Sequence, residues 1–151
     1  MSIEQELLEL IRRPSAHGTE DLVDEFRRGR DIRDLLCLLR SQNRDVLLWA
    51  LRTVTEVKFN RATADIILPR LEELCEQRAR VEEAELVRFM SINALLSTFA
   101  DLNGEPGVME KLTRFAESED VELSDGARAT IAVINATKMK LAKRRSNTTS
   151  S

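Results

Sequence analysis

The stretch RDVLLWALRTVTEV, residues 44–57, decides how this chain folds. It contains neither glycine nor proline, and as a helix it would carry apolar side chains nearly all the way round. A helix that packs on one side only has a single apolar stripe and a polar opposite face. The stretch therefore predicts a helix with neighbours on more than one side.

The rest of the chain predicts further helices, because glycine (5) and proline (3) are scarce and fall mainly between periodic segments. We expect Ser2, Thr19, Asp31 and Thr63 to start helices as N-terminal caps. Pro69 either kinks its helix or marks the true first turn. The expected helices cover about residues 3–13, 19–29, 31–42, 44–57, 62–77, 81–102, 107–118 and 124–145. The predicted fold class is all-α with about eight helices, as one domain over residues 1–145 followed by a disordered tail, 146–151.

Three helix pairs recur at an irregular interval of about 34 to 42 residues. Their second helices share spaced residues: Asp45-Val46, Ala50-Leu51 and Val54; then Leu86-Val87-Arg88 and Ala94-Leu95; then Asp125, Ala127-Arg128-Ala129 and Ile131. Over residues 31–134 the pattern resembles the HEAT and armadillo class of helical repeats. That resemblance implies a right-handed α-α superhelix of HEAT-like hairpins, in which stacking buries two faces of each inner helix.

The sequence lacks the signals of membrane-spanning proteins, of secreted proteins and of cysteine-based redox or zinc sites. No stretch approaches the roughly 18 uninterrupted apolar residues of a membrane span, and MSIEQELLELIRR places acids where a secretion signal carries positive charge. We therefore expect a cytoplasmic protein that contacts no membrane. Cys37 and Cys75 have no second Cys or His close by, so we expect two buried apolar residues rather than a redox pair or zinc site.

Charge is distributed unevenly along the chain. Lys138, Lys140, Lys143, Arg144 and Arg145 cluster near the end, and setting them aside leaves 18 basic against 26 acidic residues, a charge of −8. An acidic body disfavours phosphate backbones and attracts basic partners. The basic run suits the last turns of a helix without any ligand, and with no Tyr and 4% aromatic residues the chain has little to stack on bases. We expect no nucleic-acid binding.

Catalysis has little support, and we expect no enzyme and no cofactor. His17 is the only histidine, and no Ser or Cys pairs with it in sequence, so it is interpreted as a surface-loop residue. Glycine-rich phosphate loops and metal-binding motifs are absent from the sequence. The carboxylate groups around Glu73, Glu83 and Glu119 interleave in part with arginines, which favours a solvated, salt-linked face over paired catalytic acids or metal ligands.

Protein binding remains the best-supported function, because stacked hairpins expose a ridge of second helices. Projecting residues 44–57 onto a helix groups one set opposite the core face: Asp45, Trp49, Arg52, Thr53 and Glu56. Trp49 is either an interface hot spot or a residue that packs on the next hairpin. On the following second helix we add Arg88 and the acidic group Glu82, Glu83 and Glu85, close to where a basic partner could dock. Ser91 and Asn93 are further polar candidates on that helix.

A closer resemblance rests on three soft motifs: Phe-x-x-Gly at residues 26–29, Leu-Leu-x-Leu-Leu ending at Leu39, and Thr-Glu-Val at residues 55–57. These are similar to small bacterial HEAT-like proteins encoded beside secreted toxins, several of them immunity proteins. The resemblance implies a monomer that neutralises a basic toxin by binding it. An adaptor or regulatory subunit of another complex fits equally well, and an enzyme on a helical-repeat scaffold, such as a DNA glycosylase, is the third alternative.

Overall fold

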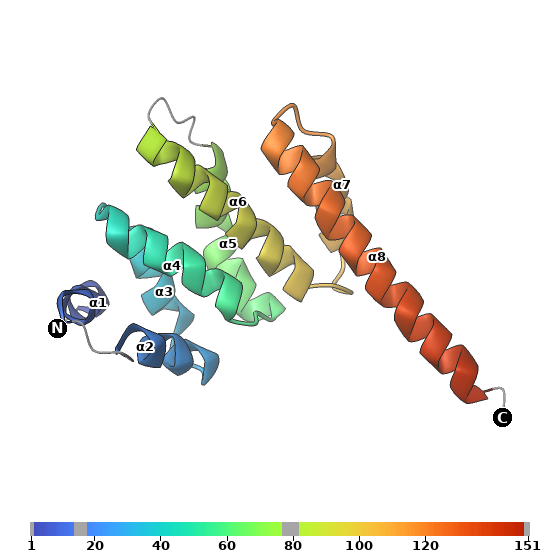
Figure 1. The fold of residues 1–151 in the computed structure, drawn as a ribbon, viewed down its shortest axis with the longest axis horizontal. Coiled ribbons are helices and arrows are strands. Elements are labelled where there is room, and N and C mark those ends of the chain that lie inside the picture. The colour runs from blue at the N-terminus through green and yellow to red at the C-terminus, as the bar shows by residue number, and fades with distance from the viewer. Residues whose placement is uncertain (1, 14–17, 77–81, 150–151) are drawn as a thin grey trace. The chain divides into compact units, whose positions relative to one another are not determined.

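The computed structural model describes residues 2–13, 18–76 and 82–149, without the side chains of residues 82–84 and 147–149 (Figure 1). Eight α-helices and no strand occur within those residues, so the predicted all-α class is confirmed. The helices are α1 (Ile3–Arg12), α2 (Gly18–Arg27), α3 (Ile32–Leu39), α4 (Arg44–Glu56), α5 (Arg61–Glu76), α6 (Glu82–Asp101), α7 (Val108–Ala116) and α8 (Val121–Thr149). They divide into two compact units, Met1–Asp101 and Leu102–Ser151, where the sequence indicated one domain.

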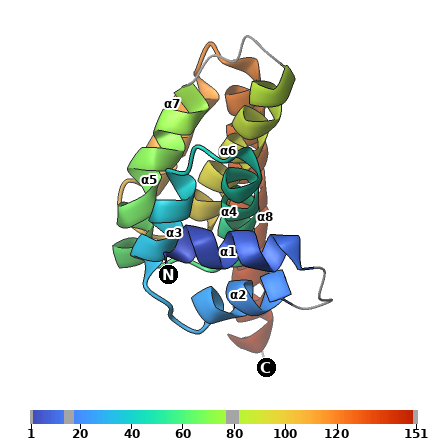
Figure 2. The same cartoon turned by 90° about the vertical axis from the view of Figure 1, so that its left-hand side faces the viewer.

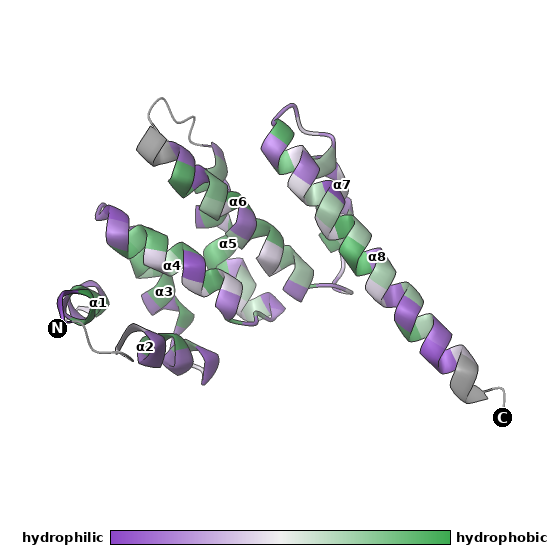
Figure 3. Ribbon diagram, in the orientation of Figure 1, coloured by the Kyte–Doolittle hydropathy of each residue, from purple (hydrophilic) through white to green (hydrophobic). Residues whose placement is uncertain are grey.

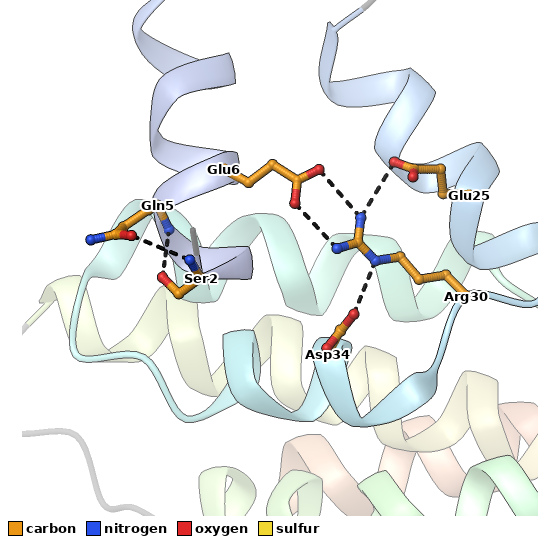
Figure 4. Close-up of polar contacts among 6 residues, drawn as sticks. All are labelled: Ser2, Gln5, Glu6, Glu25, Arg30 and Asp34. Atoms are coloured by element: carbon orange, nitrogen blue, oxygen red, sulfur yellow. Dashed lines mark hydrogen bonds and ion pairs between the residues drawn. The ribbon is translucent and has the colours of Figure 1, made fainter.

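Local capping explains several helix starts. Ser2 and Gln5 form a reciprocal capping box, in which each side-chain oxygen accepts a hydrogen bond of 3.2 Å from the other residue's backbone N–H (Figure 4). The Asp31 carboxylate accepts the Arg33 N–H at 3.0 Å. The caps predicted at Ser2 and Asp31 are therefore confirmed.

Three helices begin earlier than the sequence indicated. Helix α2 begins at Gly18, so Thr19 lies inside its first turn and the prediction of Thr19 as the cap was wrong. Asn60 and Thr63 exchange backbone-to-side-chain hydrogen bonds of 3.1 and 2.9 Å, and α5 begins at Arg61 between them. Thr63 is thus inside the first turn, and Pro69 lies in the interior of the helix rather than at its start. Asp120 accepts the Ser124 N–H on its carbonyl at 2.9 Å, which starts α8 at Val121. That helix continues to Thr149, past residue 145 where the tail was expected to begin.

The first unit contains two layers of helices. Helices α3 and α5 pack side by side in one layer, and α4 and α6 in the other (Figures 1 and 2). Helix α4 contacts α3, α6 and α1, and Val46, Ala50, Leu51 and Val54 on it are fully buried. Val46 and Leu51 are about 140° apart around the helix. Residues 44–57 are therefore apolar around most of the helix for the predicted reason, namely that α4 has neighbours on several sides. The right-handed superhelix stays a prediction.

Arg30 joins the first three helices through charge (Figure 4). Its guanidinium lies 3.2 Å from Glu6 on α1, 3.4 Å from Glu25 on α2 and 3.0 Å from Asp34 on α3. It also lies 5.7 Å from the centroid of the Phe26 ring. The hydrogen bond with Glu6 is the main cause that raises the pKa of Arg30, against the opposing effect of burial. One cation thus holds three acids from three helices.

The second unit is a helical hairpin of α7 and α8. Its buried side chains include Leu102, Val108, Leu112, Ala127 and Ile134. The Ser124 hydroxyl donates a 2.6 Å hydrogen bond to the Ala116 carbonyl, which ties the end of α7 to α8. Because α8 has 29 residues and α7 has 9, the later part of α8 extends beyond α7. Hydrophilic and hydrophobic residues alternate along this part of α8 (Figure 3).

The two cysteines have different environments. Cys75 is buried on α5, as predicted, whereas Cys37 on α3 is exposed. The prediction for Cys37 was wrong because α3 buries Leu35, Leu38 and Leu39, and the position of Cys37 between them turns away from that side.

Candidate protein-binding face

The outward side of α4 carries most of the residues predicted for it. Asp45, Arg52 and Glu56 are exposed, and the Arg52 Nε lies 3.5 Å from a Glu56 carboxylate oxygen. The Glu56 carbonyl also accepts a 3.1 Å hydrogen bond from Arg27 Nε of α2. The charged residues predicted for the α4 surface are therefore exposed to solvent.

Thr53 is the exception, because its side chain is only 1% exposed. Its hydroxyl donates a 2.8 Å hydrogen bond to the carbonyl of Trp49, one turn earlier in α4. Thr53 lies about 80° around the helix from Asp45, which is far enough to turn it toward neighbouring helices. We correct its assignment: Thr53 is a core residue whose hydroxyl is satisfied within its own helix.

Trp49 lies at the border between the exposed and buried sides of α4, and it is half-buried. The sequence left two interpretations of Trp49 open, an interface hot spot and a residue that packs on a neighbouring helix. Half-burial is compatible with both, because part of the side chain is covered and the rest is exposed to solvent. A partly exposed Trp next to charged side chains is the composition typical of an interface hot spot.

The start of α6 is described less completely. The side chains of Glu82 and Glu83 lie outside the described residues, while Glu85 is exposed and Arg88 is half-buried. Asn93, one of the additional polar candidates, is exposed. The other, Ser91, is fully buried, and its hydroxyl donates a 2.6 Å hydrogen bond to the Val87 carbonyl. Ser91 is therefore not a contact residue.

Two functional candidates on α6 were missed by sequence reasoning. Phe89 is 54% exposed and Leu86 is 42% exposed. Their spacing with Asn93 follows the i, i+3, i+7 pattern of one helix face, which is the signal that could have grouped them. That signal was hidden because α6, like α4, is apolar around most of its circumference.

The outward sides of α4 and α6 are comparable positions in the first unit. The two helices pack side by side and run in the same direction (Figure 1). Matching the buried pair at residues 50–51 with the buried pair at residues 94–95 places Phe89 at the position of Asp45 and Asn93 at that of Trp49. We define the α4/α6 face as Asp45, Trp49, Arg52, Glu56, Glu85, Leu86, Arg88, Phe89 and Asn93.

Residues 2–13, 18–76 and 82–149 include no group of three or more His, Cys, Asp or Glu side chains arranged to hold a metal ion. His17 lies outside those ranges. A helix with the length and hydropathy needed to cross a bilayer is likewise not found among the described segments.

Asp101 has a raised pKa, and its carboxylate connects two segments of the fold. Burial raises its pKa, while the hydrogen bond from the Phe59 N–H and the charge of Lys58 oppose that shift. The Phe59 N–H to carboxylate distance is 3.1 Å, so Asp101 fastens the α4–α5 connection to the end of α6.

Comparison with known proteins identifies no relative: no protein-family model, no curated protein and no solved structure matches the chain.

Proposed function

We propose that the chain binds a protein partner through the α4/α6 face. The observation that carries this proposal is the exposure of Phe89 on α6, on a helix packed beside the one that holds half-buried Trp49 and the Arg52–Glu56 pair. Protein interfaces combine large aromatic anchors with a charged rim. Leu86, three residues before Phe89, is also exposed, so the two form an apolar pair rather than an isolated side chain.

Charge favours a basic partner. Residues 1–101 contain 19 acidic and 15 basic side chains, which gives this unit a formal charge of −4. An acidic surface speeds association with a basic protein and makes the rate sensitive to salt. The group Glu82, Glu83 and Glu85 at the start of α6 adds acids next to Leu86 in the sequence.

The most concrete version of this function is a cytoplasmic immunity protein that neutralises a basic bacterial toxin by direct binding, without catalysis or cofactor. Its support is the HEAT-like hairpin pattern of the sequence together with the soft motifs at residues 26–29, 35–39 and 55–57. The alternative is an adaptor or regulatory subunit, which would use the same face. The identity of the partner separates the two.

Affinity capture with variants tests the face directly. Tagged chain would be incubated with cell lysate at low and high salt, and the retained proteins identified and then purified for affinity measurement. We expect Phe89→Ser and Trp49→Ala to weaken binding of the retained partner by about 1–3 kcal/mol each. Ile11→Ser is the matched control, because Ile11 is an exposed apolar residue on α1, and it should bind as the parent does.

Two outcomes would count against the proposal. Equal loss of binding in the Ile11 variant would indicate a general effect on the fold rather than a local face. Unchanged affinity in both the Phe89 and the Trp49 variant would place the partner elsewhere.

Reversal of Glu82, Glu83 and Glu85 to Lys should slow association with a basic partner, and the difference should shrink as salt is raised.

A further inference from the structure

The side of α8 that faces away from α7 carries exposed residues at coiled-coil spacing. Positions alternating by three and four residues are all exposed: Glu122, Asp125, Ala129, Ala132, Ala136, Met139 and Lys143. We call this set the α8 stripe. The buried residues Ser124, Ala127 and Ile134 lie on the opposite side of the helix. Two helices pack as a coiled coil along positions with this spacing where these are apolar, as Ala129, Ala132, Ala136 and Met139 are.

The centre of the α8 stripe is apolar and narrow. Alanines occupy its three middle positions, Met139 follows at 67% exposure, and Val133 beside them is 65% exposed. Small side chains let two helix axes approach closely, since the distance between packed helices depends on the residues at the contact. Exposed apolar side chains on either side of the alanines would then gain burial from the approach.

Charge gives the α8 stripe a direction. On α8 itself, residues 121–125 contain two acidic side chains and no base, whereas residues 126–149 contain six basic side chains and no acid. On the α8 stripe, Glu122 and Asp125 precede the alanines and Lys143 follows them; Arg128, which also precedes them, is not on the stripe. A parallel copy of α8 would place like charges against each other, and an antiparallel copy would place acids against bases.

We propose that two copies of this chain associate through antiparallel packing of their α8 stripes. In the register that sets Ala132 against Ala136 of the second copy, Ala129 meets Met139 and Asp125 meets Lys143 of that copy. Val133 then lies near the two-fold axis, and every contact occurs twice, as a closed isologous dimer requires. This inference stands apart from the proposed binding function, and it replaces the expectation of a monomer.

The expected dimer is weak. A contact along one face of one helix falls in the class of small interfaces, below about 1,200 Å² of buried surface. We therefore expect a Kd in the micromolar range, about 1–100 µM. The association should weaken as salt is raised, because the outer contacts are between exposed charges.

Sedimentation equilibrium of the full chain over a concentration series tests the dimer. Ala132→Glu places a bulky charge in the centre of the α8 stripe at an exposed position, so it should abolish self-association while helicity by circular dichroism is kept. Ala62→Glu is the matched control, since Ala62 is exposed on α5 and receives the same change. It should dimerise as the parent does.

A charge exchange provides a test that does not depend on disruption. Asp125→Lys and Lys143→Glu should each weaken the dimer about tenfold, because each converts two opposite-charge contacts into like-charge contacts. The double variant D125K/K143E should recover the parent affinity. Any one of three results would overturn the proposal. The parent chain could stay monomeric throughout the series, the Ala132→Glu variant could dimerise normally, or the double variant could bind no more tightly than the single variants.

Discussion

Replacing Leu51 by alanine tests whether α4 is packed on more than one side. Leu51 is fully buried, and it lies about 140° around α4 from the equally buried Val46. If neighbours cover only one side of this helix, one of the two residues must tolerate truncation. If α3, α6 and α1 all pack on it, as the structure has it, neither should.

The magnitude follows from what the substitution removes. Leu→Ala deletes three carbon groups, worth about 2.4 kcal/mol in transfer free energy at about 0.8 kcal/mol each. The cavity that remains adds to this, so we expect a loss of about 3–4 kcal/mol. Leu86→Ala is the control, because Leu86 is 42% exposed on α6 in the same unit and its truncation should change stability by less than about 1 kcal/mol.

Urea unfolding followed by tryptophan fluorescence isolates the relevant unit. Trp49 is the only tryptophan in the chain and lies on α4 itself, so its emission reports the first unit. The Leu51 variant should lower the midpoint at an unchanged slope. A loss below about 1 kcal/mol would refute the reasoning, because no fully buried leucine in a close-packed core is expected to be so tolerant.

The remaining predictions concern charge and the second unit. Arg30→Met should lower stability by about 1–2 kcal/mol in low salt, because three acids lose their shared cation; unfolding at high salt should show a smaller loss. Because burial raises the pKa of Asp101 in the fold, its charged form costs stability above the folded pKa and nothing below the unfolded one. Asp101→Asn, which keeps an acceptor for the Phe59 N–H, should therefore stabilise at about pH 7 and be neutral at about pH 3, as pH-dependent urea curves would show. The α7–α8 hairpin has a small core, so ellipticity should begin to fall before Trp49 fluorescence changes; coincident transitions would contradict this.

Local signals in the sequence predicted the helices well. A cap is made by residues two or three positions apart, so Ser2 and Asp31 could be recognised without any tertiary information. The start of α5 was placed late because Asn60 and Thr63 are both good caps and exchange hydrogen bonds with each other. Sequence alone offered no reason to prefer the earlier residue.

The candidate face could be predicted only in part, for a reason that two phenylalanines illustrate. Phe89 and Phe99 both lie on α6, yet the first is 54% exposed and the second is buried. In a helix that is apolar around most of its circumference, hydrophobic periodicity does not separate the side covered by neighbours from the side left open. The prediction for Thr53 was wrong in the opposite direction. Its polar side chain indicated exposure, but the residue is buried and its hydroxyl donates a hydrogen bond within its own helix.

The contrast between α1 and α8 is the reason for which we propose a partner for the outer side of α8. Both helices bury one side, but α1 exposes Glu9 and Arg12 on the other, so water covers it at little cost. The corresponding side of α8 exposes Ala129, Ala132 and Ala136 in succession. A helix that needed only solubility there could carry charges throughout. Acids at the start and bases at the end of α8 complement the helix dipole, and with exposed alanines between them they also favour one orientation of a second helix over the reverse.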